Sequence, residues 1–141
     1  MARAKHRSST RDGSKFVALP NVVLDCPAYR RLSFSARALL VDIARQFTGS
    51  NNGRLVLCEK AMKARGWASP TTIQRAAKEL LAAGFICKTR QGYRPNTASW
   101  YALTWQALDW SKDMDISAAA FPRGAYLKNS DPQKMEYEAP A

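Results

Sequence analysis

The stretch of residues 57–86 constrains the fold most, because it holds two short amphipathic helical patterns joined by a tight turn. The second pattern starts with Ser69 as a helix cap and Pro70 at the first helical position, a combination typical of a helix start. Gly84 stands where the pattern ends, and glycine often terminates a helix in the left-handed conformation. The spacing therefore predicts a helix over residues 70–83.

A basic β-hairpin is predicted after this helix. Residues 85–90 and 100–104 are rich in β-branched and aromatic side chains, which favour strands. The nine residues between them, 91–99, contain Gly92, Pro95 and Asn96 and are typical of a turn. Three of the four tryptophans, Trp100, Trp105 and Trp110, recur at five-residue spacing, and we expect core packing or a dimer interface for them rather than base stacking.

A further helix is predicted upstream, beginning after Ser33 or Ser35 and ending at residues 48–49. Its apolar side chains recur at helical spacing and form one stripe: Ala36, Leu39, Leu40, Ile43, Ala44 and Phe47. Residues 16–32 contain two prolines and are expected to lie as an extended piece across the core, with a short helical turn from Pro27.

Between these helices we expect a short strand over residues 54–57 and a helix over 58–65. Gly66 is placed to end this helix. Trp67 follows, and we expect its ring to pack between the helices rather than to bind a ligand.

Helix, turn, helix and basic hairpin, in this order, predict a mainly α fold with a small β-hairpin, an α+β fold of the winged helix-turn-helix type. We expect residues 1–15 to be a basic disordered arm and residues 16–110 to be the winged helix-turn-helix domain. Residues 111–141 are expected to be a C-terminal tail, either free or docked on the domain as an extended segment.

The distribution of charge points to a polyanionic partner. The net charge is +11, and residues 16–110 carry 13 basic against five acidic side chains, whereas residues 111–141 are nearly neutral. A positive field attracts a polyanion and gives salt-dependent binding through counterion release. We therefore expect double-stranded DNA as the partner.

The sequence argues against several other classes of protein. No Gly-rich phosphate loop, nucleophile elbow or paired carboxylate motif is present, so no enzyme is expected. Three widely spaced cysteines and the lone His6 favour neither a metal site nor a disulfide framework, and no cofactor is expected. No apolar run is long enough for a membrane span, and no secretory signal is visible, so a cytoplasmic, nucleoid-associated protein without a membrane partner is predicted.

Residues 53–90, GRLVLCEKAMKARGWASPTTIQRAAKELLAAGFICKTR, resemble winged helix-turn-helix proteins of bacteria, phages and plasmids. In that family a Ser/Thr-capped recognition helix ends in leucine, two residues, glycine, an aromatic residue and isoleucine, which here is the run 81–86. The resemblance extends over residues 16–105, where the chain is similar to a small group carried on proteobacterial mobile elements. Cys58 departs from the Ser/Thr cap usual before the first helix of the motif, which leaves the start of that helix open.

The expected DNA contacts fall into three sets. On the recognition helix they are Ser69, Thr71, Thr72, Gln74, Arg75 and Lys78. On the wing, residues 88–100, they are Lys88, Arg90, Tyr93 and Arg94, and on the arm Arg3, Lys5, Arg7 and Arg11. Arginine pairs with guanine and glutamine with adenine in the major groove, whereas wings and arms meet phosphates or the minor groove.

Two functions remain open. The first is a sequence-specific regulator, or a protein that binds an origin or partition site, acting as a homodimer on two half-sites. The second is a nucleic-acid-binding adaptor in a larger replication or nucleoprotein machine, which binds DNA non-specifically and a protein partner through residues 111–141.

Overall fold

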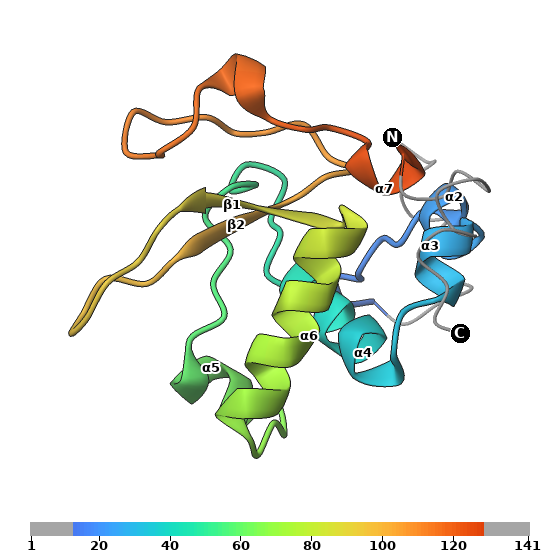
Figure 1. The fold of residues 1–141 in the computed structure, drawn as a ribbon, viewed down its shortest axis with the longest axis horizontal. Helices are drawn as coiled ribbons and strands as arrows, with labels where there is room; N and C mark the ends of the chain where they lie inside the picture. Colours follow the sequence, from blue (N-terminus) through green and yellow to red (C-terminus); the bar gives the residue numbers. More distant parts are fainter. Residues whose placement is uncertain (1–12, 129–141) are drawn as a thin grey trace.

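The computed structural model describes residues 13–128 and shows an α+β fold (Figure 1). In this part of the chain six short to medium helices, one 3-10 turn and one two-stranded antiparallel hairpin follow one another. The helices are α2 (Asn21–Leu24), α3 (Pro27–Arg30), α4 (Phe34–Ala44), α5 (Glu59–Ala64), α6 (Pro70–Ala83) and α7 (Ala125–Lys128), and the strands are β1 (Ile86–Arg90) and β2 (Trp100–Leu103). The 3-10 turn η2 spans Ala118–Ala120.

Helix α6 has the predicted ends. The hydroxyl of Ser69 accepts a hydrogen bond from the amide of Thr72 at 3.3 Å, and Gly84 ends the helix at φ +86°. The apolar side of α6 is buried and consists of Ile73, Ala76, Ala77 and Leu80. Leu81 lies at the edge of this buried stripe and is half-buried.

Helix α4 packs against α6 and supplies five of the buried core residues, Ala36, Leu39, Leu40, Ile43 and Ala44. Ser33, rather than Ser35, is its cap, and the helix ends at Ala44, earlier than predicted. It ends there because the amides of Gln46 and Phe47 bond to carbonyls three residues back, which tightens the last turn. Phe47 is consequently half-buried at the margin of the core.

The predicted strand over residues 54–57 is wrong except for one residue pair. Leu55 forms an isolated bridge with Tyr101 of β2. The backbone of the next residue, Val56, bonds instead to the side chain of Gln46, with distances of 3.0 Å to the amide and 2.7 Å to the carbonyl. Gln46 thus covers the edge of this segment that faces away from β2, and pairing with β2 is limited to Leu55 and Tyr101.

Residues 16–32 are not one extended piece, because each proline begins a helix. Pro20 is the cap residue of α2, and Pro27 occupies the first position of α3. These helices cover one side of the core, where the ring of Tyr29 meets fully buried Phe85 edge-on at 6.2 Å. Only the predicted helical turn from Pro27 is confirmed.

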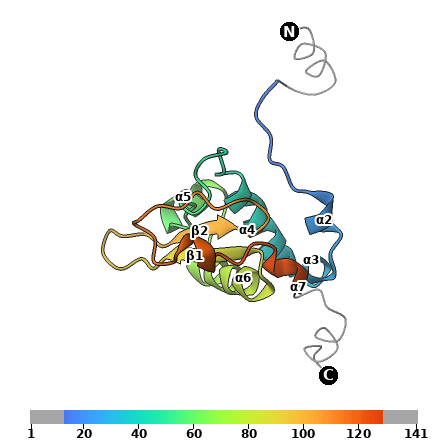
Figure 2. The same ribbon diagram turned by 90° about the horizontal axis from the view of Figure 1, so that it is seen from above.

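Residues 105–128, here named the strap, run back along the side of the hairpin that faces away from α5 and α6 (Figures 1 and 2). At its end Tyr126 is buried and stacks on Phe85 with centroids 5.4 Å apart. The amide of Gly124 donates to the carbonyl of Thr104 at 2.8 Å. Residues 111–128 are thus docked on the folded body, and residues 129–141 lie outside the described part.

Candidate nucleic-acid interface

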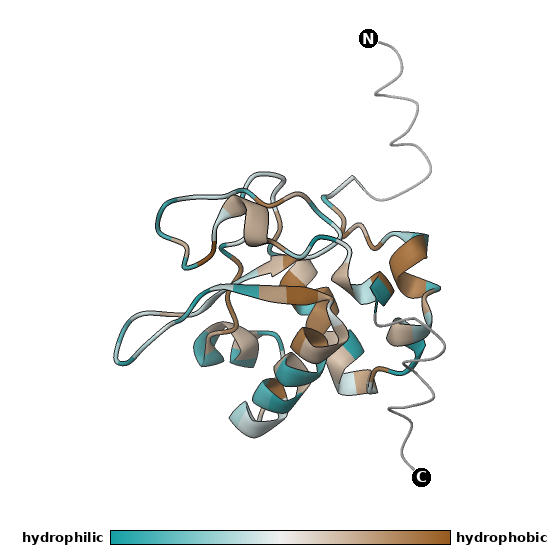
Figure 3. Ribbon diagram, turned by 45° about the horizontal axis from the view of Figure 1, so that its top comes forward, coloured by the Kyte–Doolittle hydropathy of each residue, from teal (hydrophilic) through white to brown (hydrophobic). Residues whose placement is uncertain are grey.

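The exposed side of α6 carries the polar residues that the sequence placed there. Thr71, Gln74, Arg75 and Lys78 are exposed, whereas Ser69 and Thr72 are half-buried at the capped start of the helix. The buried stripe faces α4, so the two sides of α6 separate cleanly, and the outer turns are hydrophilic in Figure 3. This exposed row of side chains is a prerequisite for contact with base edges in a groove.

Helix α5 adds basic side chains that the sequence reasoning missed. Lys60 and Lys63 are exposed on the helix that precedes the turn into α6. Lys63 lies 3.8 Å from Glu59, an exposed ion pair of little energetic weight. The sequence could have indicated Lys60 and Lys63, since the first helix of a helix-turn-helix crosses the nucleic-acid backbone.

Two carboxylates near this surface are engaged with other groups. Glu79 of α6 accepts from the backbone amide of Ser33 at 2.6 Å and from its hydroxyl at 2.8 Å, which places a negative charge at the amino end of α4. Asp42 accepts from the indole of Trp67 at 2.7 Å and lies 3.2 Å from the guanidinium of Arg65. Trp67 therefore packs between helices as expected.

The basic side chains of α6 and of the hairpin tip are, in contrast, uncompensated. Within residues 13–128, Arg75, Lys78 and Arg94 form no ion pair. Because no carboxylate neutralises these cations, the surface keeps the positive potential that attracts a polyanion.

Lys88 and Arg90, both expected on the wing as DNA contacts, lie on opposite faces of the hairpin. Opposite residues of an antiparallel pair share a face. Lys88 lies opposite Tyr101, whereas Arg90 lies opposite Trp100, because a bulge between Lys88 and Arg90 shifts the register. Strict alternation would have put Lys88 and Arg90 on the same face.

Arg90 is held by its own chain. Its guanidinium lies 3.5 Å from the centroid of the Trp100 ring and donates to the carbonyl of Ala98 at 2.9 Å. Arg54 approaches the same ring at 5.8 Å. Arg90 thus stiffens the hairpin, in a way that the sequence did not indicate, and its predicted contact with DNA stays a prediction.

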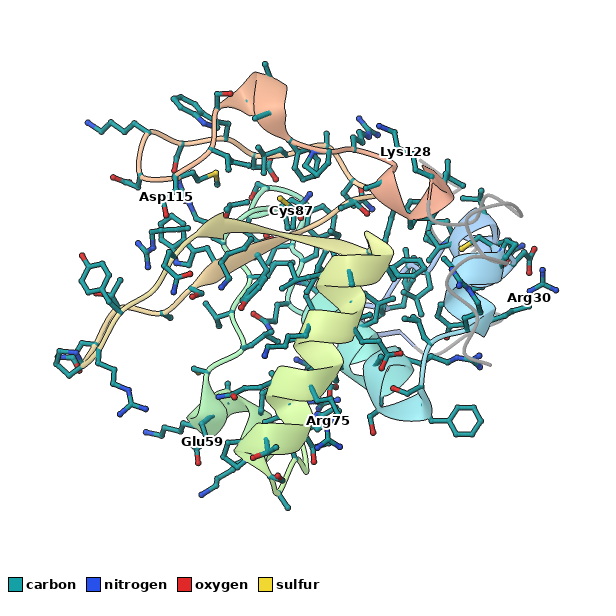
Figure 4. The ribbon with its side chains drawn as sticks, in the orientation of Figure 1. Arg30, Glu59, Arg75, Cys87, Asp115 and Lys128 are labelled. Atoms are coloured by element: carbon teal, nitrogen blue, oxygen red, sulfur yellow. The ribbon has the colours of Figure 1, made fainter. Side chains whose placement is uncertain are left out.

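The hairpin tip and the helices enclose a common hollow. Tyr93, with 71% of its surface exposed, and exposed Arg94 stand at the tip, where a backbone bridge joins Tyr93 to Thr97. Cys58, Gln74 and the loop 91–99 line an open hollow of about 550 Å³. Gln74 of α6 and the hairpin tip therefore face the same space, and the tip lies on the side of the molecule away from Arg30 and Lys128 (Figure 4).

The tryptophans of the return strand and strap have packing roles. Trp105 packs against the core, and Trp110, 49% exposed, donates its indole N–H to the carbonyl of Ile116 at 2.9 Å. Trp100 supports Arg90. The four arginines and lysines expected on the arm lie outside the described residues: Arg3, Lys5, Arg7 and Arg11.

The cysteines have no arrangement suited to metal binding. Cys26 is buried, Cys58 exposed and Cys87 half-buried, and none forms a disulfide. Burial raises the pKa of the Cys87 thiol, which keeps it protonated. Among residues 13–128 no three His, Cys, Asp or Glu side chains cluster closely enough to hold a metal ion.

Comparison with protein-family models, with curated proteins and with solved structures finds no match. Within the described chain, no helix has the length and apolar character that crossing a bilayer requires.

Proposed function

We propose that this protein is a winged helix-turn-helix protein that binds double-stranded DNA and has no enzymatic activity. In this proposal α6 enters the major groove, and the β1–β2 hairpin is the wing, which contacts the backbone or the minor groove. The observation that supports the proposal is the hollow that Gln74 of α6 shares with the hairpin tip, since it brings an exposed residue of α6 and the tip to one space.

The residues have roles that follow from their chemistry. Arg75 is suited to donate two hydrogen bonds to a guanine, and Gln74 to pair with an adenine. Lys78 lies one turn beyond Gln74 and Arg75 on α6 and is suited to a phosphate, as is Lys60, which is exposed on α5. Arg94 is the cation nearest the hairpin tip and is suited to a narrow minor groove.

Sequence-specific regulation, or binding to an origin or partition site, is the favoured role, with a homodimer on two half-sites about 34 Å apart. The adaptor alternative places a protein partner on residues 111–141, which contain the aromatic residues Phe121, Tyr126 and Tyr137. Tyr126 is instead buried against Phe85, which supports the regulator over the adaptor.

Selection from a random duplex library, followed by titration of the selected and a scrambled site, tests this proposal. A regulator binds the selected site about 10³-fold more tightly or better, whereas an adaptor binds both equally. Failure to bind any duplex at low salt would overturn the DNA-binding proposal itself.

A further inference from the structure

The strap occupies the free edge of β1 at one residue, Asp115. Its backbone amide donates to the carbonyl of Thr89 at 2.7 Å, and its carboxylate accepts from the amide of Gln91 at 2.7 Å. β1 is paired with β2 along its other edge. Asp115 thus pairs with the edge of β1 as one residue of a third strand would. Its carboxylate oxygen accepts the hydrogen bond that a backbone carbonyl would accept in a regular strand.

The strap residues next to Asp115 are fixed by contacts of their own. The neighbouring Met114 is buried and packs on Gly53, where an added Cβ would lie 2.5 Å from the methionine Cε. The indole of Trp110 closes the strap loop on the carbonyl of Ile116. The carboxylate is therefore presented to the hairpin from a fixed base, on the side opposite α5 and α6 (Figure 4).

Asp115 is attached where the hairpin ladder is irregular. The bulge between Lys88 and Arg90 interrupts the ladder at this point, and beyond it only the loop 91–99 extends toward solvent. A bulge bends a strand, so the angle of the tip depends on what fixes the bulged residues. The contacts of Asp115 with Thr89 and Gln91 span that bend.

We infer that Asp115 is a positioning residue, which sets the direction of the hairpin tip and thereby the place of Arg94 relative to α6. The inference rests on the proposed function for its effect on DNA. The restraint on the hairpin itself is independent of any ligand and can be measured without one.

Asp115→Ala removes the acceptor and one negative charge. Asp115→Asn removes the same charge but keeps an oxygen acceptor, and Asp113→Ala removes an equal charge at an exposed residue two positions away. If charge alone matters, all three variants bind a short mixed-sequence duplex slightly more tightly than the original protein. If Asp115 positions the tip, only Asp115→Ala binds less tightly, by about fivefold.

Two further readouts separate this role from a general loss of structure. Hydrogen exchange of the Gln91 amide, measured without DNA, accelerates about 5- to 10-fold in Asp115→Ala and is unchanged in the other two variants. In an Arg94→Ala background, Asp115→Ala has no additional effect on DNA affinity, since both act through the same tip.

Unchanged exchange at Gln91 in Asp115→Ala would overturn the inference. Equal duplex affinity of Asp115→Ala and Asp113→Ala would do so as well. If the original protein binds no duplex, the proposed function fails, and the exchange measurement still decides whether Asp115 restrains the hairpin.

Discussion

Asn52 is a single buried side chain on which three segments depend. It is fully buried, and its amide nitrogen lies 3.0 Å from the carbonyls of Leu103 and Ala107 and 3.3 Å from that of Gln106. Its oxygen accepts from the amide of Leu103 at 2.7 Å. These bonds tie the turn before Leu55 to β2 and to the start of the strap.

Asn52→Ala should therefore lower the free energy of unfolding strongly. A net hydrogen bond contributes about 1 kcal/mol, and a buried amide left without a partner costs about 1–3 kcal/mol. With the Leu103 amide orphaned and the strap carbonyls released, we expect a loss of about 3–5 kcal/mol in the free energy of unfolding. This is a large fraction of the roughly 5–15 kcal/mol of a typical domain.

Urea denaturation followed by tryptophan fluorescence measures this loss, provided that the denaturant slope stays constant. The matched control is Asn51→Ala, because Asn51 makes two similar bonds, to Thr48 and Gln46, on a half-exposed turn. We expect about 1 kcal/mol there. Equal losses for the two variants would refute the reasoning that burial makes Asn52 decisive.

Three further outcomes are expected. Glu79→Ala removes the carboxylate that bonds to the amino end of α4 and should lower the free energy of unfolding by about 1–2 kcal/mol in thermal or urea denaturation, and an unchanged midpoint would argue against this cap. Arg94→Ala should reduce the slope of log affinity for a duplex against log salt concentration by about 0.9. Arg30→Ala, on the far side of the molecule, should leave this slope unchanged. Equal slopes for the two variants would show that the hairpin tip is not part of the interface. Burial raises the pKa of Tyr101 and of Tyr126, so their stabilising effect is complete below the unfolded value of about 10 and is lost as pH rises through the folded values. Ultraviolet titration beside denaturation at alkaline pH would show this, and a stability that stays constant above pH about 10 would contradict it.

Local signals predicted the elements that depend on few residues. The ends of α6 follow from Ser69, Pro70 and Gly84, each of which acts within one turn of its own position. The hairpin followed in the same way from two β-favouring segments around a turn-forming loop. The exposed face of α6 followed from helical spacing, although contact with DNA stays a prediction.

Long-range contacts explain what the sequence did not predict. Alternation places Lys88 and Arg90 on one face, and only the bulge, fixed by residues far along the chain, separates them. The strap has no periodicity of its own, because Asp115 and Tyr126 are ordered by groups about 20 to 40 residues away. Residues 54–57 pair with β2 only at Leu55, and the backbone of Val56 bonds to the side chain of Gln46, ten residues earlier, on the other edge.

We propose that the exposed row on α6 contacts bases, and substitution of Arg75 probes this contact. Affinities of the original protein, Arg75→Ala and Arg30→Ala are measured on the selected site and on every single-base-pair variant of it. We expect Arg75→Ala to lose about 1–3 kcal/mol on the selected site and to lose discrimination at one G·C pair, while Arg30→Ala keeps the original profile. An Arg75→Ala profile that retains discrimination at every position would contradict the claim.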